Sequence, residues 1–296
     1  MPELPDITVY IERLQDLVQG RVLQRARMLN AFVLRTAVPA ISSTEGQTVV
    51  AVERLGKRVV LALDGGAFIV VHLMIAGRLR WLVPGAKLPG KLALAAFEFD
   101  NGQLVLTEAG TTRRASIHVL ADRAALAASD PGGIDVMACS AADFVARLQS
   151  ENHTLKRALT SPHLFSGIGN AYSDEILHRA RLSPLALSKT LPAADAQRLF
   201  EATQAVFTEW TQRLREQALR RPDQWPDKVT AFHPEMAVHG RFGLPCPDCG
   251  TPVQRIVYAS NEANYCARCQ TAGRLLADRA LSRLLKDSWP KNVDEL

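Results

Sequence analysis

Four cysteines near the end of the chain constrain its fold more than any other feature. Cys246, Cys249, Cys266 and Cys269 follow the spacing C-x2-C-x16-C-x2-C, at which two pairs of thiolates can surround one zinc ion tetrahedrally. Turn-forming residues flank the first pair, and the run 253–265 between the pairs can form a hairpin. The sequence therefore predicts a hairpin that holds one structural zinc ion per chain.

The main alternative for these cysteines is a redox dithiol or a disulfide pair. The chain has 296 residues and only five cysteines, too few for a disulfide framework in a protein of this length. The fifth, Cys139, is expected to be a small buried apolar residue. The sequence has no signal-peptide pattern and no apolar run of about 20 residues. We therefore expect a cytoplasmic protein that does not enter a membrane.

Composition bounds the architecture and the type of partner. The chain is 47% hydrophobic, which excludes a disordered protein and predicts two domains in addition to the metal module. Its formal net charge of +5 suits an anionic partner such as nucleic acid but is too small to establish one.

The first half of the chain reads as one helix followed by short strands. Residues 6–18 place apolar side chains on one helical face, with Asp6 at the expected N-cap. From about residue 22 to residue 121, alternating or apolar runs are separated by Asp-Gly and Asn-Gly turns. This pattern predicts an all-β sandwich or barrel.

The second half has helical periodicity. The segment 141–219 is rich in Ala, Leu and Arg and predicts a second, helical domain. Within it, the Gly167-Ile168-Gly169-Asn170 turn would let backbone amides approach a phosphate, although an ordinary helix–turn–helix corner has the same pattern. From residue 273 onward, leucines at helical spacing predict a terminal helix.

Four motifs occur in a defined order along the chain. They are Met1-Pro2-Glu3-Leu4-Pro5, Leu55-Gly56-Lys57-Arg58, the Gly167-Ile168-Gly169-Asn170 turn, and Tyr265-Cys266-Ala267-Arg268-Cys269-Gln270. Together they resemble the formamidopyrimidine-DNA glycosylase and endonuclease VIII family of bifunctional DNA-repair enzymes. The similarity covers nearly the whole chain except its last segment.

The resemblance implies an α+β multidomain fold. Its expected parts are an N-terminal catalytic domain of one helix and a β-sandwich (1–125), a helix–two-turns–helix DNA-binding domain (135–240), a zinc finger (241–272) and a C-terminal helical extension (273–296). The extension lies beyond the usual end of the family.

The resemblance also implies the catalytic residues. Once Met1 is removed, the α-amine of Pro2 would attack the anomeric carbon of a damaged nucleotide and form a Schiff base after loss of the base; α-amines titrate at about pH 8. Glu3 would serve in acid–base catalysis on the sugar, and Lys57 would hold a phosphate beside the lesion. Without the resemblance, Pro2 and Pro5 are rigid residues before a helix, and Lys57 is a solvated lysine.

Further DNA contacts follow from the same alignment. Asn170 and Lys156 would contact the DNA backbone, and the zinc hairpin would add a third grip on a strand whose damaged nucleotide is turned out of the stack. Ile75 and Arg113 occupy the positions that fill the gap left by the flipped base, and Met74 directly precedes Ile75.

Three departures from the family concern the handling of the lesion. Asn261 stands where the family has an arginine that binds phosphates. We expect Asn261 to contact DNA, because asparagine can still donate a hydrogen bond, but it supplies neither the charge nor the bidentate fork of a guanidinium. Ala115 stands at a phenylalanine position, which predicts a truncated wedge. The stretch 227–236 has no match to the loop that closes over the base in oxoguanine-reading members. These departures leave open the lesion and the preference for single-stranded or duplex DNA.

Two functions fit these features. The first is a DNA glycosylase with abasic-site lyase activity, and the second is a non-enzymatic DNA-binding protein that keeps the fold and the zinc. Retention of Pro2, Glu3 and Lys57 favours the enzyme. A zinc-ribbon transcription factor, a weaker third possibility, would not need an N-terminal Pro-Glu. We expect a monomer that binds damaged DNA, single- or double-stranded.

Overall fold

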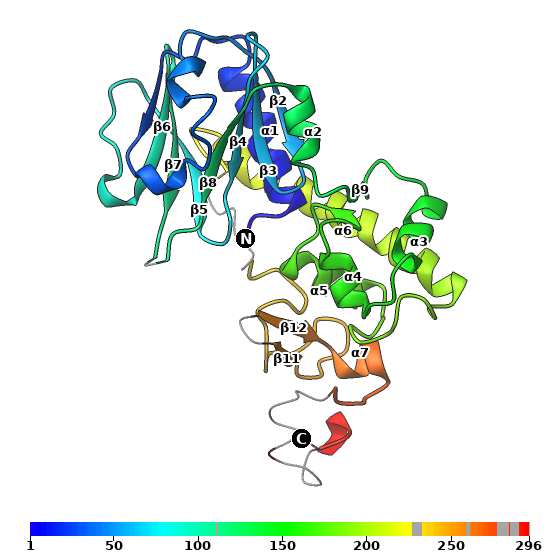
Figure 1. Ribbon diagram of the computed structural model, residues 1–296. Helices are drawn as coiled ribbons and strands as arrows, with labels where there is room; N and C mark the ends of the chain where they lie inside the picture. The colour runs from blue at the N-terminus through cyan, green and yellow to red at the C-terminus, as the bar shows by residue number, and fades with distance from the viewer. Residues whose placement is uncertain (111, 227–232, 259–260, 277–283, 285–289, 296) are drawn as a thin grey trace. The chain divides into compact units, whose positions relative to one another are not determined.

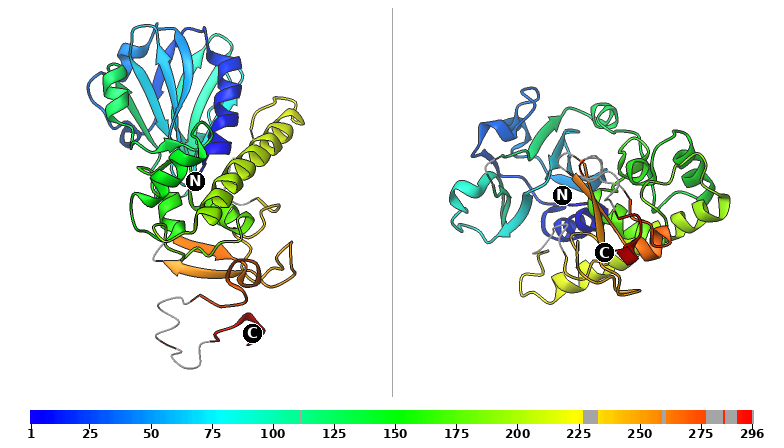
Figure 2. Two further views of the ribbon diagram at one scale, coloured as in Figure 1. Left: turned by 90° about the vertical axis from the view of Figure 1, so that its right-hand side faces the viewer. Right: turned by 90° about the horizontal axis from the view of Figure 1, so that it is seen from below.

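The chain forms two compact units, which Figures 1 and 2 show coloured from the N-terminus to the C-terminus. One comprises residues 1–131 and 210–230, and the other comprises residues 132–209 and 231–296. The first is mainly β, and the second combines helices with a small hairpin. The computed structural model describes residues 1–110, 112–226, 233–258, 261–276, 284 and 290–295.

The first unit is built from two antiparallel four-stranded sheets (Figure 1). One has the order β2-β3-β4-β8 and the other β1-β6-β7-β5. Side chains from both sheets enter one apolar core, as Leu61 and Val71 do from the first sheet and Phe97 and Leu106 from the second. This arrangement confirms the predicted β-sandwich. The strands are β1 (Arg25–Met28), β2 (Val49–Leu55), β3 (Arg58–Leu63), β4 (Phe68–His72), β5 (Gly77–Leu82), β6 (Ala93–Phe99), β7 (Gly102–Glu108) and β8 (Ser116–Leu120).

Helix α1 (Leu4–Val18) packs its apolar face into the sandwich core. Four of its side chains are fully buried there: Ile7, Tyr10, Leu14 and Val18. The helix begins earlier than predicted, with Glu3 at the N-cap and Asp6 in its first turn. The first turn tolerates a proline because its N–H groups have no intrahelical partner, so Pro5 does not delay the start of the helix.

The segment 210–230 belongs to the first unit, although the sequence predicts it within the helical domain 135–240. Trp225 is 5% exposed and packs in the sandwich core. Its ring centroid lies 5.5 Å from that of Tyr10, and its Nε1–H donates to the backbone oxygen of Leu79 at 3.0 Å. These contacts join parts of the chain that are distant in sequence, so local periodicity cannot predict them.

The second unit contains the predicted helical region. Its helices form around an aromatic cluster in which the Phe144 ring centroid lies 4.6 Å from that of Phe165 and 5.5 Å from that of Phe200. Ser140 and Asp143 make a capping box that starts the first helix. The elements are β9 (Ile134–Asp135), α3 (Ala141–Gln149), α4 (Leu155–Thr160), β10 (Phe165–Ser166), α5 (Asn170–Arg179) and the first part of α6 (Ala193–Leu219).

A two-stranded hairpin lies between the cysteine pairs, as predicted. Strand β11 (Gln254–Tyr258) pairs antiparallel with β12 (Asn261–Tyr265), and α7 (Ala267–Thr271) follows. Most of the predicted terminal helix, residues 277–283 and 285–289, lies outside the described residues.

The remaining described elements are short. They are the 3-10 turns η1 (Ala31–Val33), η2 (Ile41–Thr44), η3 (Gly90–Leu92) and η5 (Val293–Glu295), and the helix α2 (Arg123–Ala128). Within the ranges that the structure describes, no helix is long and apolar enough to span a membrane.

Candidate active site and metal centre

The residues that follow Met1 are buried at the start of α1. Glu3 is 1% exposed, and Pro2 is also buried. The Glu3 carboxylate accepts the backbone N–H of Asp6, and the Asp6 carboxylate accepts the backbone N–H of Glu3 at 2.8 Å. This reciprocal capping box holds both carboxylates against the first turn of the helix.

Burial at this end of the chain favours a neutral amine. It lowers the pKa of the Met1 amine, while the negative charge of Glu3 acts in the opposite direction. The neutral form of an amine is the nucleophilic one. After removal of Met1, the terminal amine would belong to Pro2.

Lys57 lies in the tight turn between β2 and β3, beside Gly56, whose φ of 61° is in the left-handed region. Burial lowers the pKa of Lys57, and the charge of Glu3 opposes this shift. The charge of Lys57 in turn helps to lower the pKa of the Met1 amine. The structure thus brings Pro2, Glu3 and Lys57 together in the first unit.

Asp6 also belongs to this cluster, although the sequence predicts it only as the N-cap of the first helix. It is fully buried, and desolvation raises its pKa to about 7. Its Oδ1 has no hydrogen-bond partner among the described residues. The spacing Glu3-x-x-Asp6 is a signal for a capping box, but the depth of burial depends on the sandwich around it.

The residues expected to fill the gap in the DNA have different surroundings. Ile75, between β4 and β5, is 58% exposed. Arg113 is exposed, and its Nη2 donates to the backbone oxygen of Lys91 at 2.7 Å. Ala115 is 3% exposed and belongs to the sandwich core, where its N–H donates to Glu108 at 3.0 Å. A phenylalanine at position 115 would have to be accommodated in this core, and overpacking of a core costs stability.

In the second unit, Asn170 begins α5 directly after the glycine turn. Gly167 in that turn has a φ of 89°, which glycine adopts at no steric cost. The Lys156 ammonium donates to the backbone oxygen of Asn170 at 2.6 Å, to Ser173 Oγ at 2.8 Å and to Asp174 Oδ1 at 2.6 Å. An ammonium has three donors. The predicted contact of Lys156 with a phosphate stays a prediction, and it would require breaking one of these bonds.

Helix α5 is also tied to the segment that leads into the zinc site. The Glu175 carboxylate accepts the backbone N–H groups of Ala237, Val238 and His239 at 2.7, 3.0 and 2.9 Å. Near the end of the helix, Nε2 of the buried His178 lies 3.3 Å from Cys246 Sγ. One helix therefore carries the glycine turn at its start and contacts a cysteine of the metal centre near its end.

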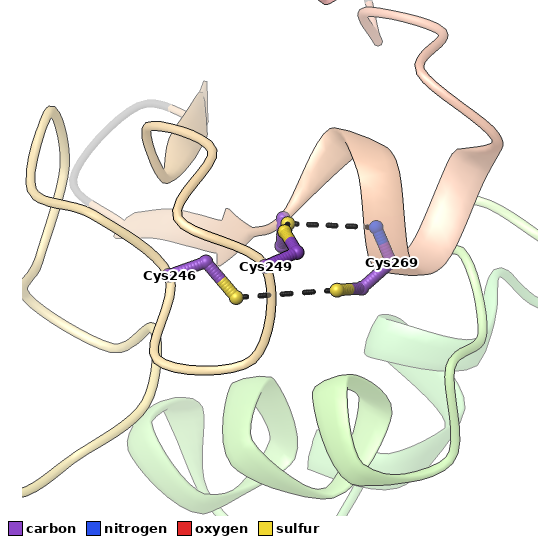
Figure 3. A group of neighbouring side chains, drawn as sticks. Cys246, Cys249 and Cys269 are labelled. Carbon is purple, nitrogen blue, oxygen red and sulfur yellow. Dashed lines mark hydrogen bonds between the residues drawn. The ribbon is translucent and has the colours of Figure 1, made fainter.

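The four cysteines converge as a zinc site requires. Their sulfur atoms all lie within 4.8 Å of one another. The sulfurs of Cys246 and Cys269 are 4.0 Å apart (Figure 3). Those of Cys249 and Cys266 are 3.4 Å apart. Zinc–sulfur bonds of about 2.3 Å in a tetrahedron place the sulfurs about 3.8 Å apart. The cysteines fit one structural zinc ion, because four thiolates leave no open coordination position.

Comparison with known proteins places the chain in a family. Three family models match it: the formamidopyrimidine-DNA glycosylase N-terminal domain over residues 1–115, the formamidopyrimidine-DNA glycosylase H2TH domain over residues 132–216, and the zinc finger found in FPG and IleRS over residues 243–272. A formamidopyrimidine-DNA glycosylase from Thermus thermophilus is 33% identical over 285 residues, which are 92% of this chain and 100% of the relative. The chain belongs to the formamidopyrimidine-DNA glycosylase family.

Solved structures agree with this assignment. The crystal structure of the MutM (Fpg) protein from Thermus thermophilus is 30% identical, with a TM-score of 0.75 and coverage of 91% of this chain and 98% of that one. A Lactococcus lactis Fpg mutant, solved with Fapy-dG-containing DNA, is 21% identical with a TM-score of 0.80, covering 91% of this chain and 100% of that one. The second likeness shows a shared fold.

Membership in this glycosylase family confirms the resemblance and supports the enzyme over the non-enzymatic alternative. The zinc finger match agrees with the four-cysteine centre. Asn261, where the family has an arginine, is the first residue of β12 and pairs with Tyr258. Its predicted contact with DNA stays a prediction. Of the stretch 227–236, residues 227–232 lie outside the described residues.

Proposed function

We propose that this family member is a DNA glycosylase with an associated abasic-site lyase activity, and that its nucleophile is the amine of Pro2. The observation that carries the proposal is the cluster in which the buried Pro2 and Glu3, at the start of α1, meet the half-buried Lys57 of the β2–β3 turn. The substrate class is DNA with a damaged base, in agreement with the name of the relative from Thermus thermophilus. We also propose that the enzyme is monomeric and works in the cytoplasm.

The reaction divides one difficult step into two. The Pro2 nitrogen forms a bond to the anomeric carbon while the bond to the damaged base breaks, and the base leaves with the electron pair and gains a proton. The sugar ring then opens, its oxygen takes a proton, and the nitrogen and the anomeric carbon form an iminium ion. Loss of a proton from the adjacent carbon then expels the 3′ phosphate.

Glu3 supports the proton transfers of this scheme. Its carboxylate lies beside the chain terminus, and its negative charge acts to raise the pKa of the Met1 amine and of Lys57. A carboxyl group in that place can give a proton to the opening sugar ring and take it back when the intermediate is hydrolysed. Because the capping box already holds the Glu3 side chain in one conformation, substrate binding does not have to order it.

Two further residues are proposed to hold phosphates. Lys57 supplies a positive charge next to Glu3. Asn170 supplies a side-chain amide at the start of α5, where the positive end of the helix dipole favours an anion. These contacts would position the strand without reading its sequence. The zinc ion, when bound, supplies stability to the hairpin and no chemistry to the reaction.

Borohydride trapping tests the nucleophile. The native chain, with Met1 removed, should be trapped covalently on DNA that contains an abasic site, because borohydride reduces an iminium to a stable amine. A chain with extra residues before Pro2 has an amide in place of the amine, and it should neither cross-link nor cleave. Equal cross-linking by the extended chain would show that a lysine is the nucleophile and that the assignment of Pro2 is wrong.

A further inference from the structure

A basic cavity in the first unit has no role in the proposed chemistry. It measures 680 Å³, and four of its lining residues carry positive charge: Arg27, Lys87, Lys91 and Arg113. Its other described lining residues are small or aliphatic, and none of the lining residues that the structure describes is a carboxylate. This volume lies in the range of about 300–1,000 Å³ that is typical of ligand pockets, but such a charged lining favours an anion over an apolar ligand.

The charges of this cavity are largely unneutralised. Arg27 forms an ion pair with Glu98 at 3.0 Å. In the described part of the chain, no carboxylate pairs with Lys87, Lys91 or Arg113. Both lysines are exposed, so their charges are available to a partner from solution.

The loop that carries the two lysines is fixed in place. It connects β5 with β6, and its Leu88 packs on the outer face of the sheet against a cluster that contains Ala96 and Val105. The side chain of Gln103 donates to the backbone oxygen of Ala86 at 3.4 Å, and Arg113 donates to that of Lys91 at 2.7 Å. A preformed arrangement of cations loses less conformational entropy when an anion binds.

Arg113 connects the cavity with DNA. The family resemblance places this arginine in the gap that a flipped base leaves. The structure holds the same guanidinium at the rim of the cavity through its bond to Lys91. In the loop between β7 and β8, which carries Arg113, the Glu108 carboxylate accepts the backbone N–H of Arg114 through both oxygens, at 3.0 and 2.9 Å. A phosphate in the cavity would therefore lie close to the arginine that enters the stack.

From these observations we infer that the cavity lined by Arg27, Lys87 and Lys91 is a phosphate subsite for the DNA backbone. It is separate from the Lys57 and Asn170 contacts, and it rests on the proposed function because it takes DNA to be the ligand. Its phosphate comes either from the damaged strand or from the complementary strand. Lys87 and Lys91 neutralise the phosphate, and Arg27, held by Glu98, lines the wall.

The test is the salt dependence of binding to DNA that contains a tetrahydrofuran abasic-site analogue, which cannot be processed. The variant Lys87→Gln/Lys91→Gln removes two charges from the cavity. The control Arg25→Gln/Arg80→Gln removes two charges from exposed positions of the same sheet, outside the cavity. In a plot of log affinity against log salt concentration, the slope should become shallower by about 0.9 for each duplex phosphate that the protein no longer neutralises. The control should keep the slope of the native chain.

The strand is identified by repeating the measurement with the damaged strand alone. If the slope becomes shallower with the duplex but not with the damaged strand alone, the phosphate belongs to the complementary strand. If the slope becomes shallower with both substrates, the phosphate belongs to the damaged strand. A cavity variant that behaves like the control on both substrates overturns the inference. Because the analogue measures binding, this outcome is separate from a failure of the proposed function, which would appear as absence of excision by the native chain.

Discussion

At the scale of single residues, Asp6 is a group whose ionisation depends directly on the fold. Burial raises its pKa from 3.8 to about 7, and the charge of Glu3 contributes in the same direction. The terminal amine and Arg78 act in the opposite direction. The carboxyl group is therefore protonated in the folded chain at pH values where the unfolded chain has lost that proton.

This difference predicts how stability changes with pH. Below about pH 4 the carboxyl group is protonated in both states, and its contribution to stability is fully present. As pH rises towards 7, the unfolded chain releases the proton and the folded chain retains it, so stability falls by up to about 1.4 kcal/mol per pH unit. Asp6→Asn should remove this dependence. The free energy of unfolding of each chain is measured by urea denaturation. The value for the variant minus the value for the native chain should therefore increase from pH 4.5 to pH 7.5.

The comparison with Asp6→Asn is needed because His72 acts in the opposite sense. Burial lowers the pKa of His72 to about 4, and the charge of Arg58 contributes to this shift. Between about pH 4 and pH 6.5 the unfolded chain therefore binds more protons at this site, and stability rises with pH. Both chains contain His72, so its effect cancels in the difference. A difference that stays constant with pH would contradict the assignment to Asp6.

Lys57 gives a second prediction at this scale. Lys57→Ala should weaken binding to abasic-site DNA regardless of sequence, and it should make the salt dependence shallower by about one unit, as expected when one phosphate is no longer neutralised. Lys57→Arg keeps the charge and should keep the slope. Fluorescence anisotropy over a series of salt concentrations measures both. An unchanged slope in Lys57→Ala would place this lysine outside the contact with DNA.

At the scale of elements, α5 joins three parts of the second unit. Its start holds the glycine turn, and Asp174 Oδ2 lies 2.7 Å from His239 Nδ1. Near its end, His178 contacts Cys246. The zinc centre is therefore supported by a helix as well as by its own hairpin.

His178→Ala should loosen the zinc centre. The imidazole N–H can donate to the Cys246 thiolate, and loss of such a supporting hydrogen bond typically costs 10- to 100-fold in metal affinity. Zinc should transfer to a chromogenic chelator at least about tenfold faster than from the native chain. His163→Ala is the matched control, because His163 belongs to the same unit and pairs with Glu151 away from the cysteines. Equal rates for the two variants would rule out a role of His178 at the metal.

The prediction from sequence was most complete where chemistry is local. The cysteine spacing predicts the hairpin between β11 and β12 because the metal requires that geometry. The packing around Lys156 and Ala115 could not be predicted in the same way. Lys156 is surrounded by acceptors from α5, and Ala115 enters the sandwich core. Both facts depend on packing between segments, which a one-dimensional pattern does not encode.

At the scale of the whole molecule, the same limit explains the segment 210–230. Helical periodicity continues through α6, so the sequence places this segment with the helices around it. Its membership in the first unit comes from Trp225 and from the ion pair between Arg215 and Glu12. Family membership fixes the overall fold, but the contacts that assign such a segment are set by individual side chains.

Excision from duplex DNA depends on residues from both units. A flipped nucleotide leaves a gap opposite an unpaired base, and unstacking costs a few kcal/mol unless side chains fill the space. Ala115 provides no aromatic ring for that gap, and Asn261 lacks the charge of an arginine. We therefore expect a higher ratio of single-strand to duplex excision than in relatives that have both groups. Ala115→Phe cannot test this cleanly, because position 115 is in the core.

Ile75→Ala provides the cleaner test, because Ile75 is 58% exposed and its truncation leaves the core intact. If Ile75 fills the gap, its truncation removes burial worth about 1.5–3 kcal/mol, so duplex excision should fall at least roughly tenfold. Excision from the same strand without its complement should change little. Val83→Ala, at a position that is 67% exposed beyond β5, is the control. If Ile75→Ala lowers excision equally in the two contexts, or leaves duplex excision unchanged, another side chain fills the gap, and Met74 is the first to test.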